Sequence, residues 1–167
     1  LAHNLARARQ AAPDAKVWAV VKANAYGHGI ERVYAGLRGA DGFALLDLAE
    51  AQRVRALGWR GPVLLLEGCF EPRDLELCSQ LRLWHTVHHE AQIDWLAAHK
   101  TNTAHHVFLK LNSGMNRLGF NADAHRSAWQ VRRASAVAMP MSWSKSMSSI
   151  PALASLITIA GVSLIRA

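Results

Sequence analysis

Short apolar runs separated by polar, helix-like stretches recur along most of the chain. Five runs begin 26, 20, 20 and 24 residues apart: Val17–Val21, Phe43–Leu46, Val63–Leu66, Leu83–Val87 and Val107–Leu111. The runs are continuous rather than alternating, which is typical of parallel strands that are covered on both faces. The pattern therefore predicts five strands of a parallel sheet.

Helical spacing follows each of the first four runs. The stretch Leu48–Leu57 places apolar residues near one face and stops at Gly58, a common helix end. A strand–helix repeat of this kind is typical of a barrel or of an open doubly wound sheet. A complete (β/α)8 barrel needs roughly 200–250 residues, and the chain opens at Leu1 in what resembles the middle of a helix. We expect an α/β fold, a partial (β/α)8 TIM-type barrel of parallel strands that is incomplete at both ends.

Composition narrows the class of protein. The chain has 167 residues, 51% hydrophobic and 19% charged, which is enough for one soluble domain with a core. Its formal charge of +7 comes without a basic run or a nucleic-acid-binding motif, so we expect no nucleic acid partner. Cys69 and Cys78 lack metal or redox spacing and indicate reduced thiols of a cytoplasmic protein, and the nine histidines lack metal-ligand spacing.

A lysine ends the first apolar run, and a glycine-rich turn follows it at once, in Trp18-Ala-Val-Val-Lys-Ala-Asn-Ala-Tyr-Gly-His-Gly29. Sites in parallel α/β folds form at the carboxyl ends of the strands. A lysine among apolar neighbours loses solvation of its ammonium, which favours the neutral amine that Schiff-base chemistry requires. Taken alone, Lys22 would more often be a surface residue whose stem packs along apolar neighbours.

A second distinctive string, Phe108-Leu-Lys-Leu-Asn-Ser-Gly-Met-Asn-Arg-Leu-Gly-Phe120, follows the fifth run. The guanidinium of Arg117 suits anionic oxygens because it offers a fixed fork of donors. Alone, Arg117 would more often form a surface ion pair.

Both strings closely resemble the two signatures of alanine racemases, in the same order and with the expected spacing, and the resemblance extends from Leu1 to about Phe120. It implies a pyridoxal-phosphate-dependent interconversion of L- and D-alanine, which supplies D-alanine for peptidoglycan. Alanine would be the substrate, and the full-length family forms homodimers.

The resemblance also implies roles for single residues. Lys22 would bind pyridoxal phosphate covalently and act as the base on the D-alanine side. Tyr26 would lie near the cofactor phosphate, although a ring packed over the turn is compatible with that role. Arg117 would reach the phenolic oxygen of the cofactor and help to hold the substrate carboxylate. Lys110 matches a lysine that some relatives carry as a carbamate, and a plain buried lysine is an equal alternative.

The composition and pattern of the sequence change after about Arg126. All twelve acidic residues lie at or before Asp123, and the family's later motifs are not found. We therefore predict a racemase barrel segment over residues 1–126 and an atypical tail over 127–167, with a shifted reading frame as one hypothesis and a variant helix as the other. The terminal apolar run, about 16 residues long, is shorter than the roughly 20 that a membrane span needs, so we expect no membrane partner.

Two other functions remain open at this point. The first is another barrel protein that uses pyridoxal phosphate, an amino-acid decarboxylase or a carrier of the cofactor, although Tyr26-Gly-His-Gly29 argues against both. The second is a non-catalytic remnant with unprotected strand edges. We expect this chain alone to have little or no racemase activity, even if it binds the cofactor, because the second base and the later cofactor contacts are not found in it.

Overall fold

The computed structural model describes residues 1–101, 103–134, 157–159 and 162–165, without the side chains of residue 131 onward. The chain divides into two compact units, unit 1 (residues 1–64 and 140–167) and unit 2 (residues 65–139). Each is described by itself. Strand β3 (Val63–Leu65) lies at their boundary.

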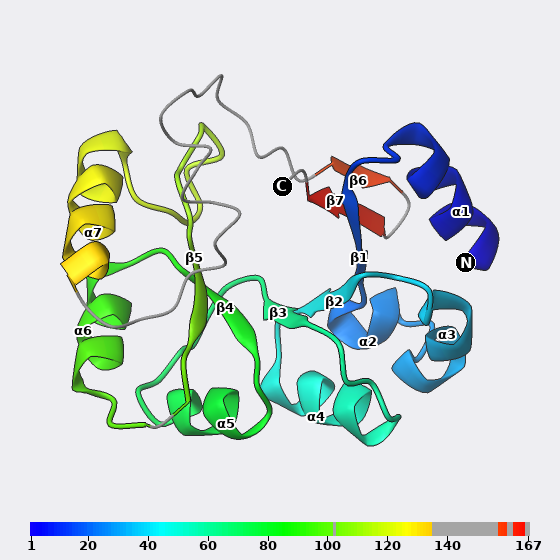
Figure 1. Ribbon diagram of the computed structural model, residues 1–167, viewed down its shortest axis with the longest axis horizontal. Coiled ribbons are helices and arrows are strands. Elements are labelled where there is room, and N and C mark those ends of the chain that lie inside the picture. The colour runs from blue at the N-terminus through cyan, green and yellow to red at the C-terminus, as the bar shows by residue number, and fades with distance from the viewer. Residues whose placement is uncertain (102, 135–156, 160–161, 166–167) are drawn as a thin grey trace. The chain divides into compact units, whose positions relative to one another are not determined.

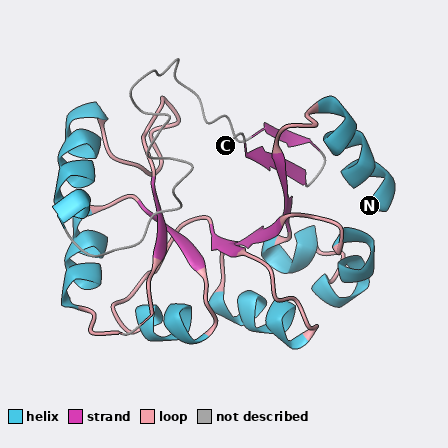
Figure 2. Ribbon diagram, viewed as in Figure 1, coloured by secondary structure: helices cyan, strands magenta, loops and turns pink. Residues whose placement is uncertain are grey.

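Strands and helices alternate in unit 1, as Figures 1 and 2 show. The elements are α1 (Ala2–Ala11), β1 (Lys16–Val20), α2 (Lys22–Tyr26), α3 (Ile30–Leu37), β2 (Gly42–Leu45), α4 (Leu48–Ala56), β6 (Ile157–Ile159) and β7 (Val162–Ile165). Strands β1 and β2 are parallel, with Trp18 opposite Gly42. The predicted parallel pairing is therefore present.

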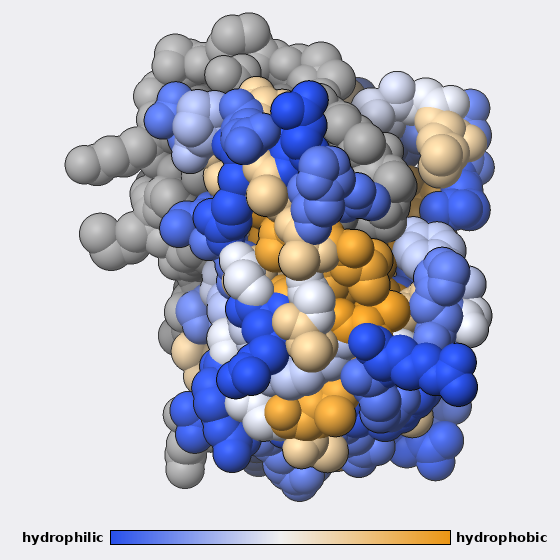
Figure 3. Space-filling model, turned by 90° about the vertical axis from the view of Figure 1, so that its right-hand side faces the viewer, coloured by the Kyte–Doolittle hydropathy of each residue, from blue (hydrophilic) through white to orange (hydrophobic). Residues whose placement is uncertain are grey.

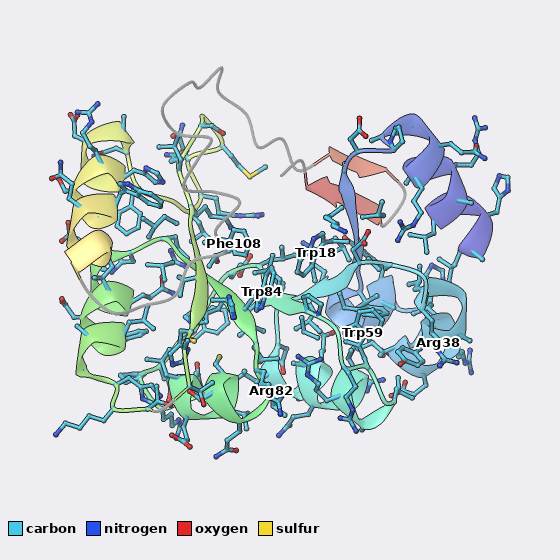
Figure 4. All side chains as sticks on the ribbon, in the orientation of Figure 1. Trp18, Arg38, Trp59, Arg82, Trp84 and Phe108 are labelled. Carbon is cyan, nitrogen blue, oxygen red and sulfur yellow. The ribbon has the colours of Figure 1, made fainter. Side chains whose placement is uncertain are left out.

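The core of unit 1 sits on these two strands. Four of the five residues of β1 and all four of β2 are buried, as expected for continuous apolar runs. Gly42 is required by close approach, because a Cβ there would lie 2.6 Å from the ring of Trp18. Phe43 adds an edge-to-face contact with Trp59, 4.8 Å between ring centroids. Figure 4 labels Trp18 and Trp59.

Helices cover the strands of unit 1 with one apolar face each. Helix α3 buries Ile30, Val33 and Leu37, which recur at helical spacing. Helix α4 begins at the N-cap Asp47, whose side chain accepts the Ala49 N–H at 2.6 Å. Figure 3 shows the side that carries α1 and α3, where hydrophilic residues frame an apolar area.

Strands β6 and β7 depart from the all-parallel expectation. They form an antiparallel pair, and β7 also pairs antiparallel with β1 on the edge opposite β2. Both lie in the predicted atypical tail, so residues 157–159 and 162–165 are strands and not part of a variant helix. Residues 135–156 of the predicted tail lie outside the described residues.

Unit 2 carries the remaining strand–helix units: α5 (Asp74–Gln80), β4 (Trp84–Val87), α6 (Glu90–Ala98), β5 (His106–Leu109) and α7 (Ala122–Ala134). Strands β4 and β5 are parallel, with Thr86 opposite Phe108. In β5 burial alternates, because Val107 and Leu109 are buried while His106 and Phe108 are half-buried. The half-buried face is occupied by aromatic packing, with Trp84 5.8 Å from Phe108 between ring centroids (Figure 4).

Candidate active site

Lys22 lies at the carboxyl end of β1, two residues after the last residue of the strand. Its side chain is half-buried next to Val21, which is 1% exposed. Among the described residues, its amine has no hydrogen bond or ion pair in the structure. An amine without a polar partner, on a half-buried lysine, suits a nucleophile better than a structural cation.

The backbone that follows Lys22 forms a left-handed turn. Ala23, Asn24, Ala25 and Tyr26 have φ between 51° and 55°, a region that L-residues other than glycine rarely adopt. The turn closes with the Gly27 N–H on the Ala23 carbonyl at 2.9 Å. Four such residues in succession cost about 1–2 kcal/mol each, so surrounding contacts must hold this segment, called here the Lys22 turn (residues 22–29).

Side chains from α3 and α4 supply those contacts. Glu50 Oε1 accepts the Asn24 N–H at 2.6 Å. Asn24 Oδ1 accepts the Ile30 N–H at 3.2 Å and Arg53 Nη2 at 2.8 Å. Arg53 in turn donates to both carboxylate oxygens of Glu31, at 2.8 and 2.6 Å.

That ion pair is electrostatically strong but exposed. The Arg53 hydrogen bond, together with a backbone hydrogen bond, holds the pKa of the Glu31 carboxyl down at about 2 from 4.5. The same hydrogen bond raises the pKa of Arg53. Both side chains face solvent, so salt screens the pair.

Tyr26 is the last residue of α2, within the Lys22 turn, and the residue is 49% exposed. Its hydroxyl makes no hydrogen bond within the described part of the chain. The hydroxyl is therefore available to a ligand. Lys22 and Tyr26 are thus brought together in one turn of unit 1.

Lys110 and Arg117 belong to unit 2. Lys110 follows β5, and its amine donates to the Leu66 carbonyl at 2.9 Å. Thr86 Oγ1 donates to the same carbonyl at 3.0 Å. Two polar side chains at the carboxyl ends of β4 and β5 thus meet on the backbone that follows β3.

Arg117 lies in the loop of residues 111–120, called here the Arg117 loop. The Asn112 N–H donates to the Phe120 carbonyl at 2.8 Å, and the Phe120 N–H donates to the Lys110 carbonyl at 2.9 Å. Asn112 Oδ1 accepts the N–H groups of Gly114 and Asn116, each at 3.1 Å. Arg117 is exposed on this closed loop, and among the described residues its guanidinium has no partner.

Several polar residues near the carboxyl ends of the strands were not identified from the sequence. They are Asn24, Glu50 and Arg53 in unit 1, and Glu67, Thr86, His88 and Gln92 in unit 2. Glu50 and Arg53 lie 26 and 29 positions from Asn24, so no local motif marks them. The one signal in the sequence for Glu50 and Arg53 was that both are long polar side chains next to apolar positions of a predicted helix.

The cysteines and histidines of unit 2 have structural surroundings. Cys69 and Cys78 are buried free thiols with sulfur atoms 3.5 Å apart, and this contact together with burial raises the pKa of Cys78. His105 bonds to His85 at 3.2 Å, and burial lowers the pKa of His105. Within the described ranges, no group of three or more His, Cys, Asp or Glu side chains has metal-binding geometry, and no helix is long and apolar enough to cross a membrane.

Residues 1–144 match the family model described as alanine racemase, N-terminal domain. The chain belongs to this racemase family. The curated alanine racemase of Acidovorax sp. (strain JS42) is 81% identical over 127 residues, which is 76% of this chain and 35% of that protein. The alanine racemase of Delftia acidovorans is 76% identical over 129 residues, 77% of this chain and 35% of that protein. The chain thus spans about a third of the length of the curated racemases it matches.

Solved racemase structures share the fold. The biosynthetic alanine racemase of Pseudomonas aeruginosa superposes with a TM-score of 0.75 at 46% identity, over 80% of this chain and 37% of that chain. A histidine racemase from Leuconostoc mesenteroides superposes with a TM-score of 0.72 at 28% identity, over 83% of this chain and 38% of that chain. The expected partial α/β barrel segment is confirmed.

The residues present suit the cofactor that the racemase family implies. An aldehyde needs a free amine, which Lys22 offers, and anionic phosphate and phenolic oxygens need donors, which Tyr26 and Arg117 offer. All three side chains lack competing partners among the described residues. The chemistry of each of these side chains, taken within its own unit, therefore suits a group of pyridoxal phosphate.

Proposed function

We propose that this chain carries the cofactor-binding part of an alanine racemase, with Lys22 as the residue that binds pyridoxal phosphate. One observation carries the proposal: an unengaged amine on a half-buried lysine at the carboxyl end of β1, held by a left-handed turn, in a chain of the racemase family. Lys22 would hold the cofactor covalently through its amine nitrogen, which suits the aldehyde group of pyridoxal phosphate.

The side chains have distinct parts in the proposed reaction. Pyridoxal phosphate, when bound, supplies an electron-poor ring that stabilises negative charge at the α-carbon of an amino acid. Lys22 would accept the α-proton on one face as the neutral amine, or return it there as the ammonium. The Tyr26 hydroxyl donates to phosphate, and Arg117 donates to the phenolic oxygen and the substrate carboxylate.

The proposal extends to the whole enzyme. Its substrate is alanine, its product supplies peptidoglycan of the cell wall with D-alanine, and it acts in the cytoplasm as a homodimer. Family membership favours this function over a decarboxylase or a cofactor carrier. Lys110 is proposed to support Arg117, either as a plain lysine or as a carbamate.

Covalent trapping tests the assignment of Lys22. The chain is mixed with pyridoxal phosphate and reduced with borohydride, and the modified peptide is identified by mass spectrometry. We expect modification at Lys22 and its loss in Lys22→Ala. Lys16, at the opposite end of the same strand and in an ion pair with Asp41 at 3.5 Å, is the matched control. Equal modification of Lys16 and Lys22 would overturn the assignment.

A further inference from the structure

A buried carboxyl group beside the Lys22 turn has no part in the chemistry proposed above. Glu50 in α4 is 9% exposed. Its Oε1 accepts the Asn24 N–H at 2.6 Å, while its Oε2 has no hydrogen-bond partner among the described residues. Burying a carboxyl group with one oxygen unpartnered is unfavourable for folding. Its benefit must therefore lie in what Oε1 holds.

Oε1 holds a backbone group that the left-handed conformation directs at α4. Asn24 lies in the middle of the turn with φ 52° and ψ 49°. A right-handed turn would rotate its N–H away from Glu50 and lose the bond. Asn24 Oδ1 adds two contacts, to the Ile30 N–H and to Arg53, but these hold the side chain and not the peptide plane.

We propose that Glu50 is a positioning residue that selects the left-handed Lys22 turn and so fixes the direction in which Lys22 leaves β1. The value of that direction for the reaction rests on the proposed function. The selection of the turn itself does not. The two parts are therefore tested by separate measurements.

Amide hydrogen exchange tests the selection of the turn without any cofactor. In Glu50→Ala we expect exchange of the Gly27 and Gly29 N–H groups, bonded to the Ala23 and Asn24 carbonyls at 2.9 Å, to quicken at least about tenfold. Glu50→Gln keeps an acceptor oxygen and should stay within about threefold of the parent.

Two controls separate a local effect from general loss of stability. Gln52→Ala changes an exposed residue of the same helix and should leave exchange in the turn unchanged. Gln92→Ala removes buried hydrogen bonds in unit 2, to the Cys69 carbonyl at 2.8 Å and from the His88 N–H at 2.9 Å. It should quicken exchange in unit 2 and leave the Lys22 turn as in the parent.

Glycine supplies a rescue that a merely structural role would not predict. Ala23 is exposed with φ 51°, and glycine adopts this conformation without the Cβ penalty. In the Glu50→Ala background, Ala23→Gly should therefore slow exchange of the Gly27 and Gly29 N–H groups at least about threefold. The same change in the Gln92→Ala background should restore nothing in unit 2.

Trapping kinetics test the consequence for Lys22. The rate of covalent attachment is measured over a range of pyridoxal phosphate concentrations. In Glu50→Ala the limiting rate should fall about tenfold, because the amine is misdirected.

Each outcome has one meaning. Unchanged exchange of Gly27 and Gly29 in Glu50→Ala overturns the selection of the turn. Quickened exchange with an unchanged limiting rate overturns the link to Lys22. A parent chain that is not modified at Lys22 overturns the proposed function, and the exchange result then decides the role of Glu50 alone.

Discussion

The Lys22 turn and the Arg117 loop both follow the carboxyl end of a parallel strand, and they are held by opposite means. The Lys22 turn is strained and depends on Glu50 and Arg53, which lie 26 and 29 positions from Asn24. The Arg117 loop closes on itself through Asn112 and the neutral backbone of Phe120. One segment is fixed by distant, charged groups and the other by near, neutral ones.

This difference bears on function. A turn held from outside can keep a strained backbone that local interactions would not form. A loop held from within is ordered by its own sequence and leaves its tip, with Arg117, free to meet a ligand. Lys22, the proposed covalent residue, thus lies on the segment held from outside, and Arg117, the proposed electrostatic residue, lies on the self-closed one.

The largest expected effect breaks the self-closure of the Arg117 loop. Gly119 has φ +114°, and a Cβ there would lie 2.6 Å from the Asn112 nitrogen and 2.8 Å from the Leu111 carbonyl carbon. We expect Gly119→Ala to lower the free energy of unfolding of unit 2 by about 3 kcal/mol, measured by denaturant titration. Gly114→Ala, with φ +123° and no atom within 4 Å, should cost only about 1 kcal/mol. Equal losses of unfolding free energy in the two variants would show that the close backbone approach at Gly119 does not hold the loop closed.

The same contrast between local and distant contacts separates the features that the sequence could predict from those that it could not. The five strands were predicted within one or two residues, because a continuous apolar run is visible wherever both faces are covered. The left-handed turn could not be predicted from the residue types. Its four left-handed residues are Ala23, Asn24, Ala25 and Tyr26, and asparagine is the only one of these types that favours the conformation.

Long-range contacts and the tail were also missed. The bond from Asn24 to Glu50 joins two strand–helix units, and no spacing rule reports such a contact. In the tail, Ile157–Ile159 and Val162–Ile165 become strands only through pairing with each other and with β1. A sixteen-residue apolar run does not distinguish such a pair from a helix. The domain boundary at residue 126 and the shifted-frame hypothesis stay predictions.

A smaller effect compares two asparagines. Asn112→Ala removes three hydrogen bonds, including its own to Asn116 Oδ1 at 2.9 Å, and should cost about 2 kcal/mol. Asn24→Ala removes two, one of them from the charged Arg53, and should cost about 1.5 kcal/mol. High salt should reduce the second loss and leave the first unchanged, because only the second involves a charge. Denaturant titration at low and high salt measures both, and an equal salt response would contradict the contrast.

The two units should also lose stability in different pH windows. The folded-state pKa of His105 lies below 6.5 because of burial, so the unfolded chain binds the proton more readily. The stability of unit 2 should therefore fall as pH drops below about 6.5. The folded-state pKa of Glu31, about 2 against 4.5, gives unit 1 stability that is present above pH 4.5 and is lost as pH falls toward 2.

Denaturant titrations across pH separate these windows. His105→Gln should reduce the loss in unit 2 below about pH 6.5, where His88, whose pKa burial also lowers, still contributes. It should leave the acid limb of unit 1 unchanged. Glu31→Gln should do the reverse. A single shared window for both units, unaltered by either substitution, would be inconsistent with the separate charge arrangements.

The smallest effect sharpens the comparison by removing strain rather than contacts. Ala23 is exposed at φ 51°, a conformation that costs alanine about 1–2 kcal/mol and glycine nothing. Glycine also raises the conformational entropy of the unfolded chain, which offsets part of this gain in stability. Ala23→Gly should therefore raise the free energy of unfolding of unit 1 by about 0.5 kcal/mol. Ala49→Gly, exposed in the right-handed helix α4, should lower it by about 0.5–1 kcal/mol. Opposite signs for one chemical change in one unit are expected only if the Lys22 turn is left-handed in solution, and a loss of stability in both variants would rule that out.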